Sequence, residues 1–183
     1  MGMRRDRFTR KAHFEGYLAR SVYKLKDIQS KFNIIKSGDK VLDIGAAPGS
    51  WTQFAIELGA EVDAVDINKV KVGKWIEADI TKDSLFEKIS SDYDVVMSDL
   101  APKTIGVPSM DNEISYDLSK RALDIASKIL SGNGKFICKI FQSEFSPQFV
   151  KDVREVFKVV KVVKPVGSKK RSKEFYVVGM RKK

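Results

Sequence analysis

Four aspartates lie at or just beyond hydrophobic runs of the sequence, and their placement suggests a ligand site. Asp43 lies in "KVLDIG", Asp66 near the end of "EVDAVDI", Asp79 after "KWIEA" and Asp99 after "YDVVMS". Hydrophobic runs of this length are typical of buried parallel strands. Because the carboxyl ends of parallel strands meet at one edge of a sheet, we expect the four carboxylates to line one crevice. Any one of them could instead cap the following helix, a common role of strand-end aspartates.

The turn "GAAPGS", residues 45–50, indicates which ligand the crevice holds. A dinucleotide fingerprint requires G-x-G-x-x-G beneath the pyrophosphate. Alanine replaces the middle glycine here, so we expect no nicotinamide dinucleotide. A ligand without phosphates fits along Gly45–Gly49, with Asp66 accepting from ribose hydroxyls and Asp79 from an exocyclic amine. Carboxylates also favour a cation, and S-adenosyl-L-methionine combines a sulfonium, an ammonium, a ribose and an adenine without phosphate.

A second set of residues is unusual for its position in the predicted elements. Lys139 interrupts the apolar strand "GKFICKIF", where burying an ammonium is costly. Asp99 and Lys139 end neighbouring strands of the expected sheet. Lys24 on the first predicted helix and Glu174 at the start of the last strand can reach the same rim. The alternative for Lys139 is an edge-strand lysine whose ammonium extends to solvent.

The hydrophobic pattern predicts alternating helices and strands, and therefore an α/β fold with a mostly parallel sheet covered on both faces. Residues 103–114 are expected to be a loop, a candidate flexible lid, and the last two strands to pair antiparallel at an edge. The predicted helices are 21–35, 50–58, 115–130 and 146–157, and the predicted strands are 40–45, 61–67, 71–80, 93–102, 134–141, 158–165 and 174–180.

The net charge of +10 is concentrated at the two ends of the chain. Residues 1–26 carry eight Lys or Arg against two acids, residues 151–183 carry twelve against three, and the middle is acidic. We expect both ends to meet a polyanion. Cys138 is the only cysteine, and no signal peptide or membrane-spanning run is present, so we expect a soluble, cytoplasmic protein without disulfides.

The segments "ARSVYKLKDI", "VLDIGAAPGSWTQ", "SDLAPKTIG", "KIFQ" and "SKEFYVV" occur in an order that resembles the FtsJ/RrmJ-type RNA 2′-O-ribose methyltransferases. The resemblance covers about residues 14–180. It implies a Rossmann-like fold with a seven-stranded sheet and an antiparallel edge strand, and S-adenosyl-L-methionine as cofactor. It also implies a catalytic tetrad of Lys24, Asp99, Lys139 and Glu174. The cofactor contacts that it implies are Gly49, Trp51, Asp66, Asp79 and Asp99. From their place in the expected crevice, we predict Asp43 and Gly45 as further cofactor-binding residues.

The chemistry of the tetrad leaves the role of Lys139 open. A ribose 2′-hydroxyl must lose a proton while its oxygen attacks the sulfonium methyl in line. A lysine accepts a proton only when neutral, and its unperturbed pKa is about 10.4. Burial or Lys24 as a second cation would lower the pKa of Lys139, whereas Asp99 and Glu174 would raise it. Lys139 is therefore either the general base or a group that orients the hydroxyl while the proton leaves to solvent.

The sequence as a whole predicts a single methyltransferase domain over residues 1–183, with a basic and flexible segment at 1–20. By resemblance its substrate is a ribose, expected to be a uridine, in large-subunit (23S-type) ribosomal RNA or the assembled subunit. Methylation of tRNA or of an RNA cap is the alternative within the same chemistry. A non-catalytic RNA-binding module is the alternative of a different class. We expect a monomer and, with one His and one Cys, no metal site.

Overall fold

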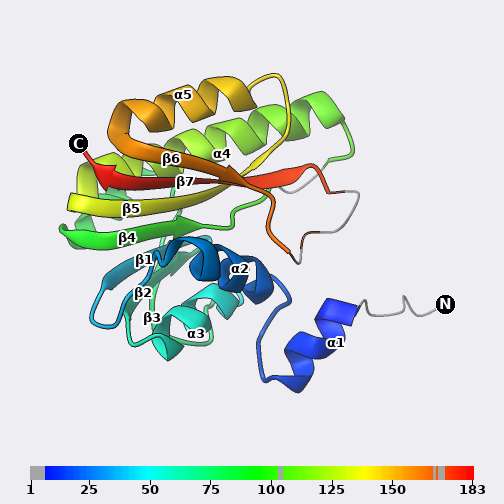
Figure 1. Cartoon of the computed structure of the whole chain (residues 1–183), viewed down its shortest axis with the longest axis vertical. Coiled ribbons are helices and arrows are strands. Elements are labelled where there is room, and N and C mark those ends of the chain that lie inside the picture. Colours follow the sequence, from blue (N-terminus) through cyan, green and yellow to red (C-terminus); the bar gives the residue numbers. More distant parts are fainter. Residues whose placement is uncertain (1–6, 103–104, 167, 169–171) are drawn as a thin grey trace.

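The computed structural model describes residues 7–102, 105–166, 168 and 172–183 (Figure 1). Its helices are α1 (Arg7–Phe14), α2 (Val22–Phe32), α3 (Ser50–Glu57), α4 (Pro108–Ile129) and α5 (Ser146–Val156), with a short 3₁₀ helix at Asp83–Glu87. Its strands are β1 (Lys40–Ile44), β2 (Glu61–Asp66), β3 (Lys74–Glu77), β4 (Tyr93–Ser98), β5 (Leu130–Phe141), β6 (Phe157–Val163) and β7 (Glu174–Lys182).

The seven strands form one sheet in the order β3-β2-β1-β4-β5-β7-β6. The strands from β3 to β5 are parallel to one another, and β7 is antiparallel to both of its neighbours, β5 and β6. The expected antiparallel pair of last strands is therefore present, with β7 one position in from the edge and β6 outermost. The expected mostly parallel, seven-stranded α/β sheet is confirmed.

Helices cover both faces of the sheet because alternate strand residues point to opposite sides. On one face, α4 and α5 pack on Val96, Phe136, Cys138 and their neighbours. On the other, α2 and α3 pack on Val95, Met97, Ile137 and theirs. Figure 1 shows α4 and α5 in the upper part of the molecule, beside β5–β7, and α2 and α3 in the lower part, beside β1–β3.

The order of the strands places the functional crevice. Successive crossovers run outward from β1 in one direction to β2 and β3, and the chain then returns to add β4 on the other side. In open α/β sheets, ligands bind outside the carboxyl ends of the strands at such a switch point. The glycine turn follows β1 here and Asp99 follows β4, so the two segments face each other across it.

Three segments differ from the sequence prediction. Residues 108–114, expected to belong to a loop, form the first two turns of α4, because Pro108 is well suited to start a helix; the loop prediction is wrong there. The third strand is limited to Lys74–Glu77, and Arg7–Phe14 form a helix that the sequence did not predict. Residues 1–6, 103–104 and 169–171, parts of the expected basic ends and loop, lie outside the described residues. Within the described residues, no helix is long and apolar enough to cross a membrane.

Candidate active site

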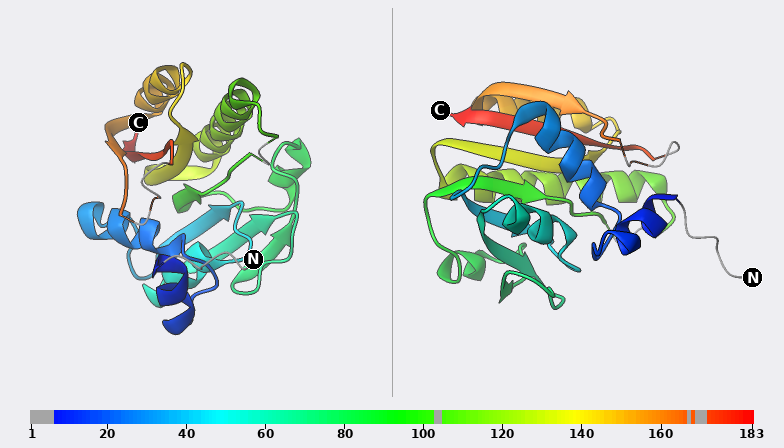
Figure 2. Two further views of the ribbon diagram at one scale, coloured as in Figure 1. Left: turned by 90° about the vertical axis from the view of Figure 1, so that its right-hand side faces the viewer. Right: turned by 60° about the horizontal axis from the view of Figure 1, so that its bottom comes forward.

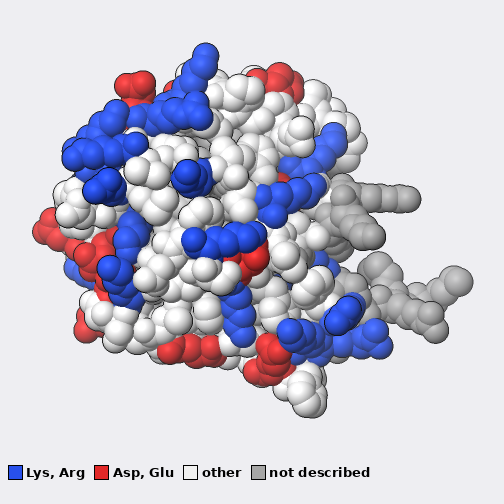
Figure 3. Space-filling model, viewed as in Figure 1, with Lys and Arg blue, Asp and Glu red and all other residues white. Residues whose placement is uncertain are grey.

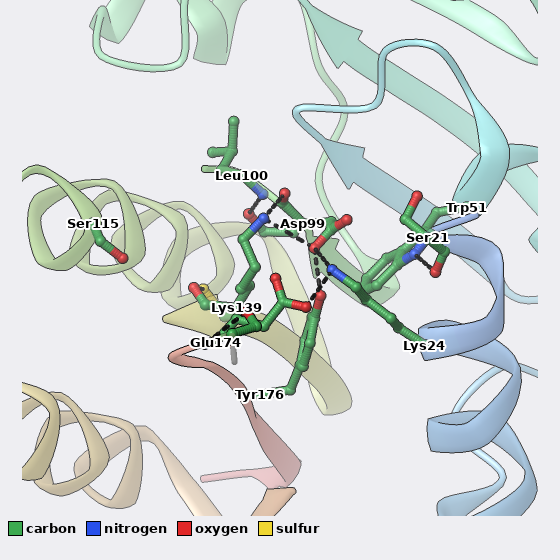
Figure 4. Close-up of polar contacts among 12 residues, drawn as sticks. Ser21, Lys24, Trp51, Asp99, Leu100, Ser115, Lys139, Glu174 and Tyr176 are labelled. Carbon is green, nitrogen blue, oxygen red and sulfur yellow. Dashed lines mark hydrogen bonds and ion pairs between the residues drawn. The ribbon is translucent and has the colours of Figure 1, made fainter. Parts of the chain in front are cut away.

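The side chain of Asp99 is the centre of a buried polar cluster (Figure 4). Its Oδ1 lies 3.1 Å from Lys139 Nζ and 3.7 Å from Lys24 Nζ, and accepts a hydrogen bond of 2.5 Å from the hydroxyl of Tyr176. Lys139 also donates to the main-chain oxygen of Asp99 at 2.5 Å, and Lys24 forms an ion pair of 2.9 Å with Glu174. The structure thus brings together all four residues of the expected tetrad.

Strand alternation explains why these side chains converge. Lys139 follows Ile137 by two residues and Asp99 follows Met97 by two, and both apolar residues face α2. Lys139 lies opposite Tyr176 in the β5–β7 ladder. The side chain of Lys139 is only 5% exposed and β5 is an interior strand, so the alternative of an edge-strand lysine extending to solvent is wrong.

Tyr176 is a member of the cluster that sequence reasoning missed. It is fully buried, and its ring lies 5.7 Å from that of Trp51 and beneath Lys24 Nζ. Burial, together with the neighbouring carboxylate of Asp99, raises the pKa of the Tyr176 hydroxyl well above its usual value, so the group remains a donor. A signal was available, since Tyr176 lies two residues after Glu174 and so shares its face of the strand.

The acids near the ends of β2 and β3 hold local turns rather than capping helices. Asp66 accepts from the backbone N–H groups of Ala47 (3.0 Å) and Asn68 (2.7 Å), and so ties β2 to the glycine turn. Asp79 Oδ1 accepts from the backbone N–H and the hydroxyl of Thr81, which lower the pKa of its carboxyl. Neither residue is the N-cap of a described helix.

Asp43 is the most deeply buried of the four aspartates, at 1% exposed. Its Oδ2 accepts a hydrogen bond of 2.6 Å from the hydroxyl of Thr52 in the first turn of α3. Burial raises the pKa of Asp43 to about 7, and the negative charge of Asp99 adds to the rise, although the Thr52 bond opposes it. A cation beside Asp43 would relieve this cost, so the carboxyl is a suitable partner for one.

Two hollows follow the crevice outward from Asp99. The smaller, about 50 Å³, is lined by Ser21, Asp43, Gly45, Ala46, Ala47, Ser50, Trp51 and Asp99. The larger, about 220 Å³, is lined by Gly45, Asp66, Ile67, Ala78, Asp79, Ile80, Thr81, Leu100, Ala101, Pro102, Ile114 and Leu118. Both are lined by acidic, hydroxyl-bearing and apolar residues, with no Lys or Arg among the described residues around them.

The segment before α2 closes the smaller hollow. The indole N–H of Trp51 donates to the carbonyl of Ser21 at 2.9 Å, and the hydroxyls of Ser21 and Ser50 lie 2.8 Å apart. Ser21 was not predicted as a site residue. Gly49, expected to contact the cofactor, lines neither hollow: with φ +113° it packs against Val70 and Val72, where a Cβ would lie 2.9 Å from a methyl of Val72.

Comparisons with known proteins agree on one family. The model of the FtsJ-like methyltransferase family matches residues 17–182. "Ribosomal RNA large subunit methyltransferase E" of Archaeoglobus fulgidus is 43% identical over 97% of this chain and 96% of its own. Among solved structures, a Plasmodium falciparum chain assigned as a ribosomal RNA methyltransferase superposes with a TM-score of 0.81 at 24% identity, covering 91% of this chain and 98% of that one. A Streptococcus mutans chain assigned as a methyltransferase, in complex with SAH, superposes with a TM-score of 0.56 at 16% identity, covering 82% of this chain and 90% of that one.

Proposed function

Because the chain belongs to the FtsJ-like methyltransferase family, we propose that it transfers a methyl group from S-adenosyl-L-methionine to a ribose 2′-hydroxyl of large-subunit ribosomal RNA. The observation that carries the proposal is the double position of Asp99. Its side chain lines the smaller hollow and is also held by Lys139, Lys24 and Tyr176. The proposed cofactor site and acceptor site therefore adjoin at Asp99, which suits an in-line transfer between reactants held close together.

The residues of the two hollows fit S-adenosyl-L-methionine. Asp43 offers a buried carboxylate to the cationic amino-acid end, and Asp66 and Asp79 offer acceptors to ribose hydroxyls and to an amine. Gly45 lines both hollows, and a Cβ there would lie 2.2 Å from Leu100 Cδ2, so the absence of a side chain lets Leu100 pack over the turn and line the larger hollow. The cofactor supplies, when bound, a methyl group made electrophilic by its positively charged sulfur.

The chain's own groups act on the acceptor hydroxyl. We assign Lys139 the role of holding the ribose oxygen, because its ammonium is fixed by the carboxylate and the carbonyl of Asp99 and so has a defined direction. Lys24, held by Glu174, adds a second cation that stabilises negative charge developing on that oxygen. The hydroxyl of Tyr176 donates to the same oxygen of Asp99 and helps to hold the carboxylate. The proton then leaves to solvent.

The substrate assignment draws on the relatives and on charge. The Archaeoglobus relative is named for the large-subunit ribosomal RNA, and it aligns with this chain over nearly its full length. Basic residues of α1 give affinity for a phosphate backbone without sequence preference. We further predict that the target nucleotide is a uridine and that residues 1–183 act as one domain. We also predict that the protein is a monomer located in the cytoplasm.

The proposal is tested by offering labelled S-adenosyl-L-methionine with large ribosomal subunits, extracted ribosomal RNA and tRNA in separate reactions. We expect label in ribosomal material at one ribose, which then resists alkaline cleavage, and none with Lys139→Met. Transfer to tRNA alone would overturn the substrate. Cofactor binding without transfer to any RNA would favour a non-catalytic binding module.

A further inference from the structure

Phe14 is the most exposed large apolar side chain among the described residues, at 91%. It ends α1, whose inward face is formed by Phe8 and Ala12: Ala12 is buried, and the Phe8 ring lies 5.4 Å from that of Tyr23. Phe14 lies on the opposite, outward side of the helix. The helix is thus anchored without any contribution from Phe14, so packing does not explain an aromatic ring at this position.

Positive charge surrounds this ring. Arg10 precedes Phe14 by four residues and Arg7 by seven, so both share its side of the helix, whereas Lys11 Nζ lies 5.0 Å from the centroid of the Tyr23 ring. Arg7 and Arg10 are exposed and make no ion pair with any described residue, whereas Lys11 lies 3.6 Å from Glu15. Figure 3 shows Lys and Arg side chains gathered over α1. An exposed aromatic ring among free arginines is the combination by which proteins stack and hold single-stranded nucleic acid.

The helix is fixed beside the candidate active site. Figure 2 (left) looks onto the carboxyl ends of the parallel strands, and α1 lies on that side. Gln53 in α3 accepts from the N–H of Leu18, and the Leu18 side chain lies 3.4 Å from the point that a Cβ on Gly49 would occupy. Phe14 is four residues before Leu18, so its Cα is at most about 14 Å from that of Leu18. The end of α1 therefore lies near the glycine turn, on the side of the sheet where the parallel strands end and Asp99 lies.

We propose that Phe14 is a stacking platform for an unpaired RNA base near the target nucleotide, with Arg7 and Arg10 on the adjoining phosphates. The proposal rests on the proposed function, since it takes RNA as the substrate. It adds a preference that the catalytic cluster does not supply, namely for RNA that is single-stranded beside the modified ribose.

The test compares Phe14→Ala, Phe14→Leu and Phe14→Trp in the full chain, by titration with a short single-stranded RNA and with a duplex of the same sequence. Loss of stacking should weaken single-strand binding by about 5- to 150-fold in the Ala and Leu variants, with little change for the duplex. The Trp variant should bind like wild type. Its added fluorescence should be quenched by the single strand and not by the duplex, after subtraction of the wild-type signal from Trp51 and Trp75.

Salt dependence separates stacking from charge. Arg10→Gln should lower the slope of log affinity against log salt by about 0.7, as loss of one single-strand phosphate contact requires, while Phe14→Ala should leave the slope unchanged.

Affinity of Phe14→Ala or Phe14→Leu within twofold of wild type would overturn the inference. Equal losses of affinity for the single strand and for the duplex would also overturn it. Normal RNA binding combined with reduced methyl transfer only on assembled subunits would overturn it as well, and would indicate that Phe14 contacts a protein partner. If wild type transfers no methyl group to ribosomal material, the proposed function fails; if it does and Phe14→Ala binds normally, only this inference fails.

Discussion

At the scale of single residues, Asp99 depends on donors from three separate elements. Lys24 comes from α2, Lys139 from β5 and Tyr176 from β7. All three donors contact Oδ1 of the carboxylate, so the loss of one leaves two that still hold it. Substitutions at Lys139 and Tyr176 separate the consequences of losing two of these donors.

Replacing Lys139 by Met removes the ammonium and keeps most of the side-chain volume. We expect methyl transfer to fall by at least about 100-fold, the lower end for loss of a group that handles the reacting proton or its charge, with cofactor affinity nearly unchanged. Equilibrium dialysis with labelled cofactor and single-turnover transfer measure the two quantities. A large loss of cofactor affinity would contradict the assignment.

Replacing Lys139 by Arg tests which of its two roles applies. Arginine keeps a positive charge but does not lose its proton in proteins, so it can orient an oxygen and cannot act as a base. Because we assign an orienting role, we expect Lys139→Arg to keep measurable transfer, well above that of Lys139→Met. Equal inactivity of the two variants, both correctly folded, would favour Lys139 as the proton acceptor.

Tyr176→Phe removes only the hydroxyl that donates to Asp99. Because hydrogen bonds to charged groups contribute about 1.5–3 kcal/mol, we expect the free energy of unfolding to fall by an amount in that range. Chemical denaturation followed by circular dichroism gives the value. Methyl transfer should fall as well, because the carboxylate loses its third donor. An unchanged stability and rate would show that the bond to Asp99 has no energetic role.

Asp43 should make stability depend on pH. Its folded pKa of about 7 lies above the usual value near 3.9, so the folded state binds the proton more tightly, and stability falls as pH rises between those values. An asparagine side chain at this position does not titrate. Asp43→Asn should therefore raise the free energy of unfolding by about 2–3 kcal/mol more at pH 8 than at pH 5. Thermal unfolding at both pH values without cofactor checks this, and a pH-independent difference would contradict it.

At the scale of elements, the glycine turn after β1 forms part of the wall of both hollows. Gly45 has φ +73°, and an added Cβ would push the Leu100 side chain, which lines the larger hollow. Gly38 is a matched control, because its φ is +84° and nothing lies within 4 Å of an added Cβ.

Alanine at either position should cost about 1–2 kcal/mol of stability from the left-handed backbone. Only Gly45→Ala should also lose cofactor affinity, since only there does the new methyl group displace a residue of the site. Isothermal titration with S-adenosyl-L-methionine, at a temperature where both variants are folded, makes the comparison. Equal affinities in the two variants would mean that Leu100 moves away without narrowing the hollow.

At the scale of the whole molecule, the basic residues lie at two separate places. Arg7 and Arg10 lie near the carboxyl ends of the parallel strands, whereas Lys158 and Lys161 lie on the outermost strand β6. Lysines on an edge strand also protect it against pairing with other chains. Two double variants, one at each place, can therefore separate the effect of where the basic residues lie from the effect of total charge on RNA binding.

The double variants Arg7→Gln/Arg10→Gln and Lys158→Gln/Lys161→Gln remove the same charge. We expect the first to lower the salt slope of RNA binding by about 1.4 and to weaken transfer, and the second to change neither appreciably. Filter binding over a range of salt concentrations measures the slopes. Equal effects of the two pairs would indicate that net charge, rather than its location, determines RNA affinity.

The sequence by itself determined the class of the fold and the family, and it predicted the residues of the candidate site. Hydrophobic periodicity is a local property, so the strands and most helices could be predicted from it, and the four tetrad residues lie in segments that resemble the family. Two helical segments could not be predicted in this way. The basic residues of α1 obscure its short amphipathic pattern, and Gly106 and Pro108 suggested a loop where Pro108 begins α4.

Only the tertiary structure decided which groups meet. The place of β7 between β5 and β6 sets Tyr176 opposite Lys139, and strand order is determined by packing between distant segments rather than by local pattern. The same packing buries Asp43 and raises its pKa, and it turns Gly49 away from the two hollows. It also leaves the Phe14 ring in solvent, because Phe8 and Ala12 already fill the contact between α1 and the rest of the molecule. Burial and exposure depend on what packs against a residue, which its neighbours in sequence do not specify.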